Sequence, residues 1–179
     1  MTQLLLDTEF TSLNASADLI SLALVDMNDE TNFFYAIFSD YDRSKLTPWQ
    51  DEHVLPFLDL SGDVEKGSNA IYLQDAYAVV VDELKVWLEQ WEAVQIWADV
   101  LAYDWVLFCE LFGGALHIPS SIHYMAMDLA TLFYTKGIDP DIDRFDYVYS
   151  GNIPNGIQRH NALADAQTGV KCYHKLIKT

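Results

Sequence analysis

Three apolar runs near the N-terminus constrain the fold of this chain more than any other feature. They cover residues 3–10, 19–25 and 32–38, and the polar segment 26–30 separates the last two. Short runs of this kind, rich in aliphatic and aromatic residues and bounded by polar turns, are typical of buried strands. The sequence therefore predicts that the chain begins with an antiparallel meander of three strands.

The rest of the chain alternates helical patterns with short apolar runs. Helices are expected over residues 48–58, 74–90, 102–112 and 129–136, and a last helix after Asn161. The core stripe of that last helix is predicted to be Ala162, Ala166, Val170, Tyr173 and Ile177. Further strands are expected over residues 94–98 and 123–127, and loops over 61–69 and 137–159, the second with one turn. This order predicts an α/β protein with a mixed sheet flanked by helices.

Length and composition indicate a single domain over residues 1–179. The cysteines, Cys109 and Cys172, match no metal-binding or redox spacing and are expected to be buried free thiols in a reducing compartment. The first residues carry no basic region, and no apolar run approaches the roughly 20 residues that span a bilayer. We therefore expect a cytoplasmic protein with no membrane partner.

The formal net charge of −17 is unusual for a protein with an anionic partner. The charge is unevenly distributed, because residues 1–129 carry four lysines and arginines against 22 acids, whereas residues 130–179 carry six against five. Any phosphate contact is therefore expected in the C-terminal segment, with Arg159, Lys171 and Lys175 as candidates. The alternative for each is the solvated face of a helix.

Two acids at the end of the first apolar run form the first candidate site. Asp7 and Glu9 are two residues apart, and side chains at that spacing point to the same face of a strand. Carboxylates beside a core are costly unless they are paired with positive charge, and hard cations such as Mg²⁺ and Mn²⁺ prefer oxygen ligands. The pair is a candidate metal site; a solvated strand end is the alternative.

A histidine and an acid five residues apart flank the start of the last helix. His160 ends the long loop, and Asp165 is expected in the second turn of the helix, at the edge of its core stripe. A rigid carboxylate next to a histidine that titrates near neutral pH suits hydrolysis by an activated water. The alternative is a surface histidine beside an acid that the helix dipole stabilises.

The middle of the chain offers two more carboxylates where a strand runs into a helix. Asp99 follows the expected strand over residues 94–98, and Asp104 lies near the start of the next helix. Ligands often collect where strands end and helices begin. Either acid is a candidate partner for Asp7 and Glu9.

Together these motifs resemble the DEDDh superfamily of 3′-5′ exonucleases, which have a ribonuclease H-like fold. The matching positions are Asp7 and Glu9, Asp104, and His160 with Asp165, and the resemblance covers almost the whole chain. The run Asp7-Thr8-Glu9-Phe10 and the surroundings of Tyr103-Asp104 also look like the branch of single-domain bacterial 3′-5′ exoribonucleases. Asp99 stands where the superfamily often has asparagine. The metal role is assigned to Asp104, because it directly follows an aromatic residue as in the family, and Asp99 is the reserve.

The resemblance implies hydrolysis with two divalent cations, Mg²⁺ or Mn²⁺, held by Asp7, Glu9, Asp104 and Asp165, with His160 as the general base. The substrate would be the 3′ end of RNA or single-stranded DNA, with RNA favoured, and the product a nucleoside 5′-monophosphate. The residues after the first motif, Phe10, Thr11 and Leu13, would bind the terminal nucleotide; for Phe10 a core position is the alternative.

Two alternative functions and the oligomeric state stay open from the sequence. One is a DNA exonuclease of the proofreading type, which would use the same chemistry. Another is a protein without catalytic activity whose acidic surface mimics nucleic acid. A homodimer is a third open question, because Trp87, Trp91 and Trp105 could cover an interface or belong to the core.

Overall fold

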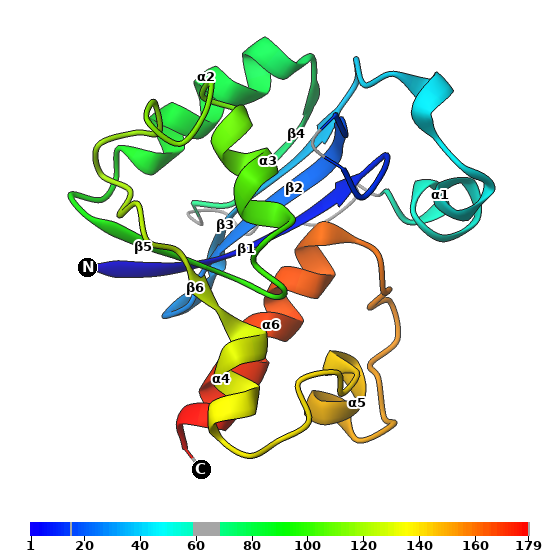
Figure 1. Cartoon of the computed structure of the whole chain (residues 1–179), viewed down its shortest axis with the longest axis vertical. Coiled ribbons are helices and arrows are strands. Elements are labelled where there is room, and N and C mark those ends of the chain that lie inside the picture. The colour runs from blue at the N-terminus through cyan, green and yellow to red at the C-terminus, as the bar shows by residue number, and fades with distance from the viewer. Residues whose placement is uncertain (15, 59–68, 179) are drawn as a thin grey trace.

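The computed structural model describes residues 1–14, 16–58 and 69–178. Within these residues, six strands form one sheet in the order β4-β3-β2-β1-β5-β6 (Figure 1). The strands are β1 (Thr2–Phe10), β2 (Leu19–Asp26), β3 (Asp29–Phe38), β4 (Ile71–Asp75), β5 (Val94–Ala98) and β6 (Met127–Asp128). The strands β1, β2 and β3 pair antiparallel. The other three pairs are parallel: β4 with β3, β5 with β1, and β6 with β5. The sheet is therefore mixed, as predicted.

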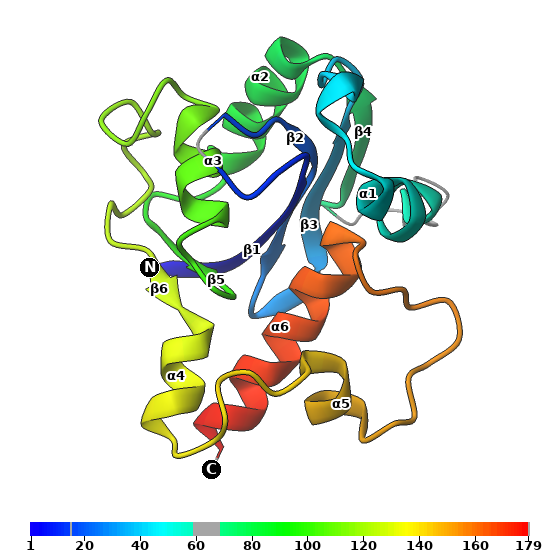
Figure 2. The ribbon, with the colours of Figure 1, turned by 45° about the vertical axis from the view of Figure 1, so that its right-hand side comes forward.

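Helices cover both faces of the sheet (Figures 1 and 2). The helices are α1 (Pro48–His53), α2 (Tyr77–Leu88), α3 (Asp104–Glu110), α4 (Leu129–Thr135), α5 (Arg144–Tyr149) and α6 (Ala162–Ile177), with 3-10 turns at Arg43–Lys45 and Leu55–Phe57. One core lies between the sheet and α2 and α3, and a second lies between the sheet and α4 and α6. Among the described residues, no helix is long and apolar enough to cross a membrane.

The central strands are buried on both faces, which explains their near-continuous apolar sequence. Every residue of β2 is buried. Along β1 the side chains alternate: Leu4 and Leu6 contribute to the α2–α3 core, whereas Leu5 contributes to the α6 core. This alternation places Asp7 and Glu9 on the α6 side of the sheet, in line with Leu5.

The structure confirms the expected meander, the strand over 94–98 and the helix caps at Asp128 and Asn161, whose side chains accept hydrogen bonds from the first turns of α4 and α6. Both cysteines are free and buried. The three tryptophans considered for an interface pack in or against the α2–α3 core instead. The loop predicted over 137–159 contains one short helix, α5.

Several boundaries differ from the prediction. The helix expected over 48–58 ends at His53, because Pro56 cannot continue an α-helix and a 3-10 turn follows. The strand expected over 123–127 is wrong in position: the regular pairing is confined to Met127 and Asp128. The stripe of α6 ends on Leu176, and Ile177 is half exposed. The strand β4 was not predicted, and most of the loop over 61–69 lies outside the described residues.

One glycine lets α6 approach the sheet closely. A Cβ atom on Gly169 would lie 2.8 Å from Cδ2 of Leu5 and 2.9 Å from its Cδ1, and Leu5 is almost completely buried. Real side chains do not approach so closely, so only glycine fits here without movement. Gly169 lies one turn after Asp165 on the same face of the helix. The close approach therefore also sets how near Asp165 comes to β1.

We expect Gly169→Ala to destabilise the protein, although the same change in an open helix position stabilises by about 1 kcal/mol. The added methyl group must displace Leu5 in a packed core, which costs about 1–3 kcal/mol. Urea unfolding of the parent and the variant measures the difference. The control is the double variant with Leu5→Val, because valine lacks the Cδ atoms that would clash. Its loss of unfolding free energy should be smaller than the sum of the losses in the two single variants. A Gly169→Ala protein as stable as the parent would contradict this close packing.

Candidate active site

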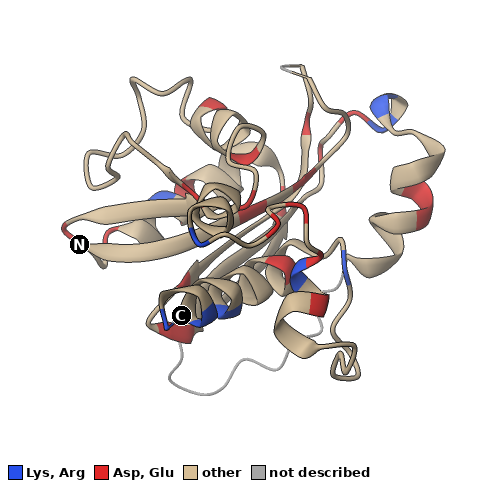
Figure 3. Cartoon of the chain, turned by 60° about the horizontal axis from the view of Figure 1, so that its bottom comes forward, with Lys and Arg blue, Asp and Glu red and all other residues tan. Residues whose placement is uncertain are grey.

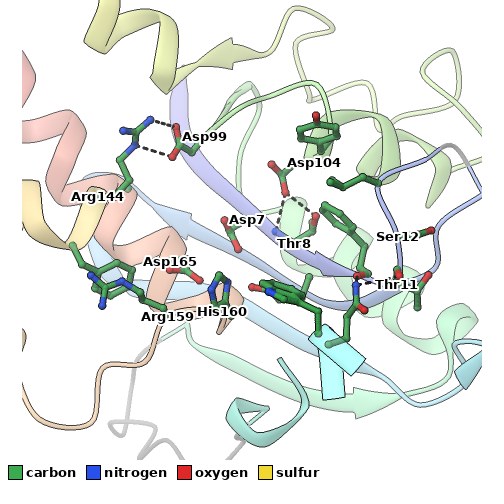
Figure 4. A pocket seen from close by; sticks show the side chains of 18 of the residues that line it. Asp7, Thr8, Thr11, Ser12, Asp99, Asp104, Arg144, Arg159, His160 and Asp165 are labelled. Carbon is green, nitrogen blue, oxygen red and sulfur yellow. Dashed lines mark hydrogen bonds and ion pairs between the residues drawn. The ribbon is translucent and has the colours of Figure 1, made fainter. Parts of the chain in front are cut away.

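A cavity of about 700 Å³ opens at the end of β1, beyond the point where β5 stops pairing with it. Its walls come from β1 and the turn after it, from α1 and α3, and from α5, α6 and the segment between them (Figure 4). These elements are far apart in sequence, but the parallel pairing of β1 with β5 and the packing of α6 bring them together. All five residues of the predicted catalytic set line this cavity: Asp7, Glu9, Asp104, His160 and Asp165.

The α6 side of the sheet contributes three of the acids. Asp7 and Glu9 project from β1, and Asp165 projects from the first turn of α6, where the side chain of Asn161 caps the helix. Glu9, His160 and Asp165 each offer a ligand atom, and these atoms lie within 4.8 Å of one another. The spacing is compact enough for one ion to contact all three groups.

Asp104 reaches the cavity from the opposite layer. Its Oδ1 accepts hydrogen bonds from the backbone N–H of Thr8, at 3.0 Å, and from the Thr8 hydroxyl, at 2.7 Å. The last pair between β1 and β5 is Leu6 with Ala98, so the carboxylate takes the place of the missing strand partner at the edge of β1. These two hydrogen bonds, drawn in Figure 4, hold the Asp104 carboxylate at the start of α3 against Thr8 of β1, the residue directly after Asp7.

Asp99, the reserve candidate, is held by another partner. Arg144 of α5 donates from Nε and Nη2 to its two carboxylate oxygens, both at 2.8 Å (Figure 4). A bidentate pair of this kind is strong and directional. Asp99 lines the cavity, but both of its oxygens face a guanidinium, whereas Asp104 keeps one oxygen free of Thr8.

His160 enters the cavity from the segment that joins α5 to α6, which Figure 2 shows as an arch outside the helices. Its backbone adopts a left-handed conformation with φ of 60°, uncommon for a residue other than glycine. The ring of Trp49 from α1 meets the imidazole edge to face at a centroid distance of 5.0 Å. Burial lowers the pKa of His160, and the nearby His53 and Arg159 lower it further. The neutral imidazole that a general base requires is therefore favoured.

The crowded carboxylates have raised pKa values. Burial is the main cause in each case: it raises the pKa of Glu9 to about 8, and those of Asp104 and Asp165 to about 7. The pKa of Asp7 also lies well above its usual value, because of burial and then the charges of Asp165, Asp104 and Glu9. Four carboxylates that repel one another in a recess fit a site that binds positive charge.

The residues predicted to bind substrate lie at the other end of the cavity. Leu13 is largely exposed, and Phe10 lines the cavity while also packing against the α2–α3 core. Thr11 is fully buried, and its hydroxyl accepts a hydrogen bond from the backbone of Asp18. Its contribution is therefore to hold the turn after β1.

Sequence reasoning missed the contribution of α1. The exposed indole of Trp49 forms one wall of the cavity, and the side-chain amide of Gln50 donates to the carbonyl oxygens of Phe10 and Thr11. The capping box formed by Thr47 and Gln50 is readable in the sequence and predicts the start of the helix. The surface that this helix faces is not readable, because the contacts are tertiary.

The chain is similar to known nucleases in sequence and in fold. Two 3′-5′ exoribonucleases of Mycobacterium tuberculosis, Rv2179c of strain H37Rv and MT2234.1 of strain CDC 1551, are each 24% identical over 174 residues, which cover 97% of this chain and 92% of the relative. The nuclease domain of 3′hExo, a DEDDh family member whose structure contains rAMP, superposes with a TM-score of 0.64 at 10% identity over 99% of this chain and 92% of that one. The latter likeness shows a shared fold.

The family comparison covers the complete site and the complete sheet. The model of the 3′-5′ exoribonuclease Rv2179c-like domain matches residues 2–177, from the start of β1 to the end of α6. The match includes the four acids, the histidine and every element that carries them. The chain therefore belongs to the Rv2179c-like 3′-5′ exoribonuclease domain family.

Proposed function

We propose that this protein removes nucleotides from the 3′ end of RNA by metal-dependent hydrolysis and releases nucleoside 5′-monophosphates. Family membership supports a 3′-5′ exonuclease activity. The observation that carries the proposal is the meeting of Asp7, Glu9, Asp104, His160 and Asp165 in one cavity, from three separate parts of the sequence. The four acids and the histidine have different roles in the proposed reaction.

The donor set fits divalent cations. Asp7, Glu9, Asp104 and Asp165 would hold two ions, Mg²⁺ or Mn²⁺, because hard cations prefer carboxylate oxygens. Burial raises the pKa values of these acids and so disfavours their charged forms, which a bound cation would stabilise. When bound, such ions lower the pKa of a water molecule and stabilise the oxygen that leaves.

The protein's own side chains perform the remaining tasks. His160 accepts the proton of the attacking water at an imidazole nitrogen, and its lowered pKa keeps that nitrogen unprotonated at neutral pH. Thr8 holds Asp104 in a fixed orientation by two hydrogen bonds. Leu13 and Trp49, both exposed and both lining the cavity, offer apolar surface to the terminal nucleotide.

The two other functions predict different behaviour. A DNA exonuclease would use the same residues and differ only in its preference for a 2′-hydrogen over a 2′-hydroxyl. An acidic mimic would present its acids on open surface, and its binding would need no metal. The four acids in the cavity are recessed instead, and two of them, Glu9 and Asp104, are less than 10% exposed. This arrangement favours catalysis over mimicry.

We expect the parent protein to release mononucleotides from the 3′ end of a 5′-labelled RNA oligomer with Mg²⁺ or Mn²⁺, and to release none with EDTA. Asp7→Ala should abolish cleavage, and His160→Ala should slow it by about 100- to 10,000-fold, because proton transfer contributes that much. Gel analysis of RNA and DNA oligomers, labelled at either end, measures direction and preference. Cleavage unchanged in Asp7→Ala would refute the mechanism, and a parent protein that cleaves neither polymer would favour mimicry.

The two candidate acids in the middle of the chain can be separated by matched isosteric variants. Asp104→Asn should lower kcat by at least about 100-fold, because an amide is a much poorer metal ligand. Asp99→Asn should keep activity within about tenfold but lower the unfolding midpoint, because Arg144 loses its charged partner. Steady-state kinetics and thermal unfolding of both variants measure these effects. The reverse ranking of the two activities would assign the metal role to Asp99.

Without metal, the protein should become less stable as pH rises from about 5 to 8. The four acids have folded pKa values above their unfolded values near 4, so the folded state holds protons that the unfolded state releases, and stability falls through this window. Thermal unfolding in EDTA at pH 5.5 and 8 measures the trend. Excess Mg²⁺ or Mn²⁺ should raise the midpoint more at pH 8.

Asp7→Asn serves as the control for this experiment, because it removes one of the repelling charges with little change of shape. Its unfolding midpoint in EDTA should depend less on pH, and the cation should stabilise it less. A parent protein whose midpoint rises with pH in EDTA, or does not respond to either cation, would contradict a metal site at these carboxylates.

A further inference from the structure

The cavity is strongly acidic for a site that receives nucleic acid. Among its described lining residues are six carboxylates and two cations; the carboxylates are Asp7, Glu9, Asp99, Asp104, Asp143 and Asp165. The cations are Arg144 and Arg159. Each phosphate of a bound strand carries a negative charge that a protein normally meets with lysine or arginine. These two arginines are therefore the candidates for a phosphate contact.

The guanidinium of Arg144 is engaged by contacts within the protein. It forms the bidentate pair with Asp99, donates to the carbonyl oxygens of Pro140 and Ile142, and lies 4.2 Å above the ring of Phe133. Its side chain is only 14% exposed. All three guanidinium nitrogens have protein acceptors, so this residue holds α5 against the end of β5.

Arg159 is held more loosely. Its side chain is 42% exposed, and its Nε and Nη2 donate to Asp143 at 3.2 Å and 3.0 Å, with Asp146 3.6 Å from Nη2. Within the part of the chain that the structure describes, its Nη1 has no hydrogen-bond acceptor. The guanidinium carbon lies over the ring of Phe145, 5.0 Å from its centroid, and this cation–π contact uses none of the N–H groups as hydrogen-bond donors.

The position of Arg159 puts this charge beside the reaction centre. The residue directly precedes His160, and Figure 4 shows its side chain next to Asp165. The two other candidates named from the sequence are engaged elsewhere: Lys171 pairs with Glu30 at 2.6 Å, and Lys175 donates to the carbonyl oxygen of Tyr147. Figure 3 shows lysines along α6, and neither Lys171 nor Lys175 lines the cavity.

We propose that Arg159 binds a phosphate oxygen of the substrate strand, and that Asp143 holds its guanidinium in place until the strand replaces the carboxylate. This inference rests on the proposed exonuclease function. The planar fork of arginine matches carboxylate and phosphate oxygens with similar geometry, so the exchange needs little movement. The phosphate is either the one that is cleaved or the next one toward the 5′ end.

Arg159→Ala tests the contact, and Lys85→Ala, on the exposed face of α2, is the control with the same change in net charge. On an RNA oligomer we expect Arg159→Ala to raise KM about tenfold and to leave kcat within about twofold, with an unchanged unfolding midpoint. The slope of log kcat/KM against log salt should also decrease by about 0.7, because one phosphate contact is lost. Lys85→Ala should match the parent in all four measurements.

Three results separate the possible failures. If the parent releases mononucleotides and Arg159→Ala has the same KM and salt slope as Lys85→Ala, the phosphate contact is refuted while the exonuclease function stands. If the parent cleaves no oligomer, the function itself fails. A fall in kcat at unchanged KM would also refute the contact, because it would mean that Arg159 only orients His160.

Asp143→Asn tests the exchange of partners. Asparagine can still cap α5, as Asp143 does by accepting from the N–H of Asp146, but it competes less well for the guanidinium. We expect KM to fall about two- to fivefold in this variant. The same substitution in the Arg159→Ala background should give no such gain. A gain that persists there would mean that Asp143 acts by general repulsion, and the proposed exchange would be wrong.

Three small substrates distinguish the two phosphates. The 4-nitrophenyl ester of a nucleoside 5′-monophosphate and a dinucleotide without a 5′-phosphate each contain one phosphate, the one that is cleaved. A 5′-phosphorylated dinucleotide also contains the next phosphate toward the 5′ end. A loss of kcat/KM in Arg159→Ala with all three would assign the contact to the cleaved phosphate. A loss confined to the phosphorylated dinucleotide would assign it to the upstream one. No loss with any of them would overturn the proposal.

Discussion

The contact between Gly169 of α6 and Leu5 of β1 is the constraint on which the site depends. Because glycine has no side chain, the helix lies directly on the strand, and the atoms of Leu5 occupy the space that a Cβ would need. One turn earlier on the helix is Asp165, and two and four residues later on the strand are Asp7 and Glu9. A packing contact of two apolar residues thus sets the spacing of three carboxylates. Moving the helix away by the thickness of a methyl group would change that spacing by a large fraction of a metal–ligand bond.

The end of β5 provides the second condition for the site. Pairing with β1 stops at Leu6, and this leaves a backbone N–H of β1 without a strand partner. The carboxylate of Asp104 accepts from it, so an acid on one layer of the protein is anchored beside acids that belong to the other layer. Asp99, five residues earlier, is turned toward Arg144, which joins the same strand end to α5. The two acids look equivalent in sequence, and their hydrogen-bond partners give them different environments.

Part of the negative charge of the chain is concentrated in this cavity. Burial and mutual repulsion raise the pKa values of the four acids, so the folded protein without cations stores unfavourable electrostatic energy that bound cations would relieve. The same charge disfavours a polyanionic strand, and the cavity offers few cations to balance it. Arg159, held loosely by Asp143, is suited to shift from one anion to another. The negative charge of the cavity therefore favours cations and gives little general electrostatic attraction for long nucleic acids.

The sequence by itself determined the strands that carry the core and the candidate residues for catalysis. Apolar runs separated by polar turns define the meander, Asn161 and Asp128 define two helix starts, and the spacing of Asp7 with Glu9 and of His160 with Asp165 is a local property of strand and helix geometry. Only the tertiary structure gave Asp99 and Asp104 different hydrogen-bond partners and placed Trp49 against His160. It also placed Arg159 at the cavity and Lys171 outside it, paired with Glu30. The strand β4 was missed for the same reason, because its five residues, none of them fully buried, become a strand only by pairing with β3. Periodicity reports which face of an element is buried, whereas the partner on that face is set by contacts between segments that are distant in sequence.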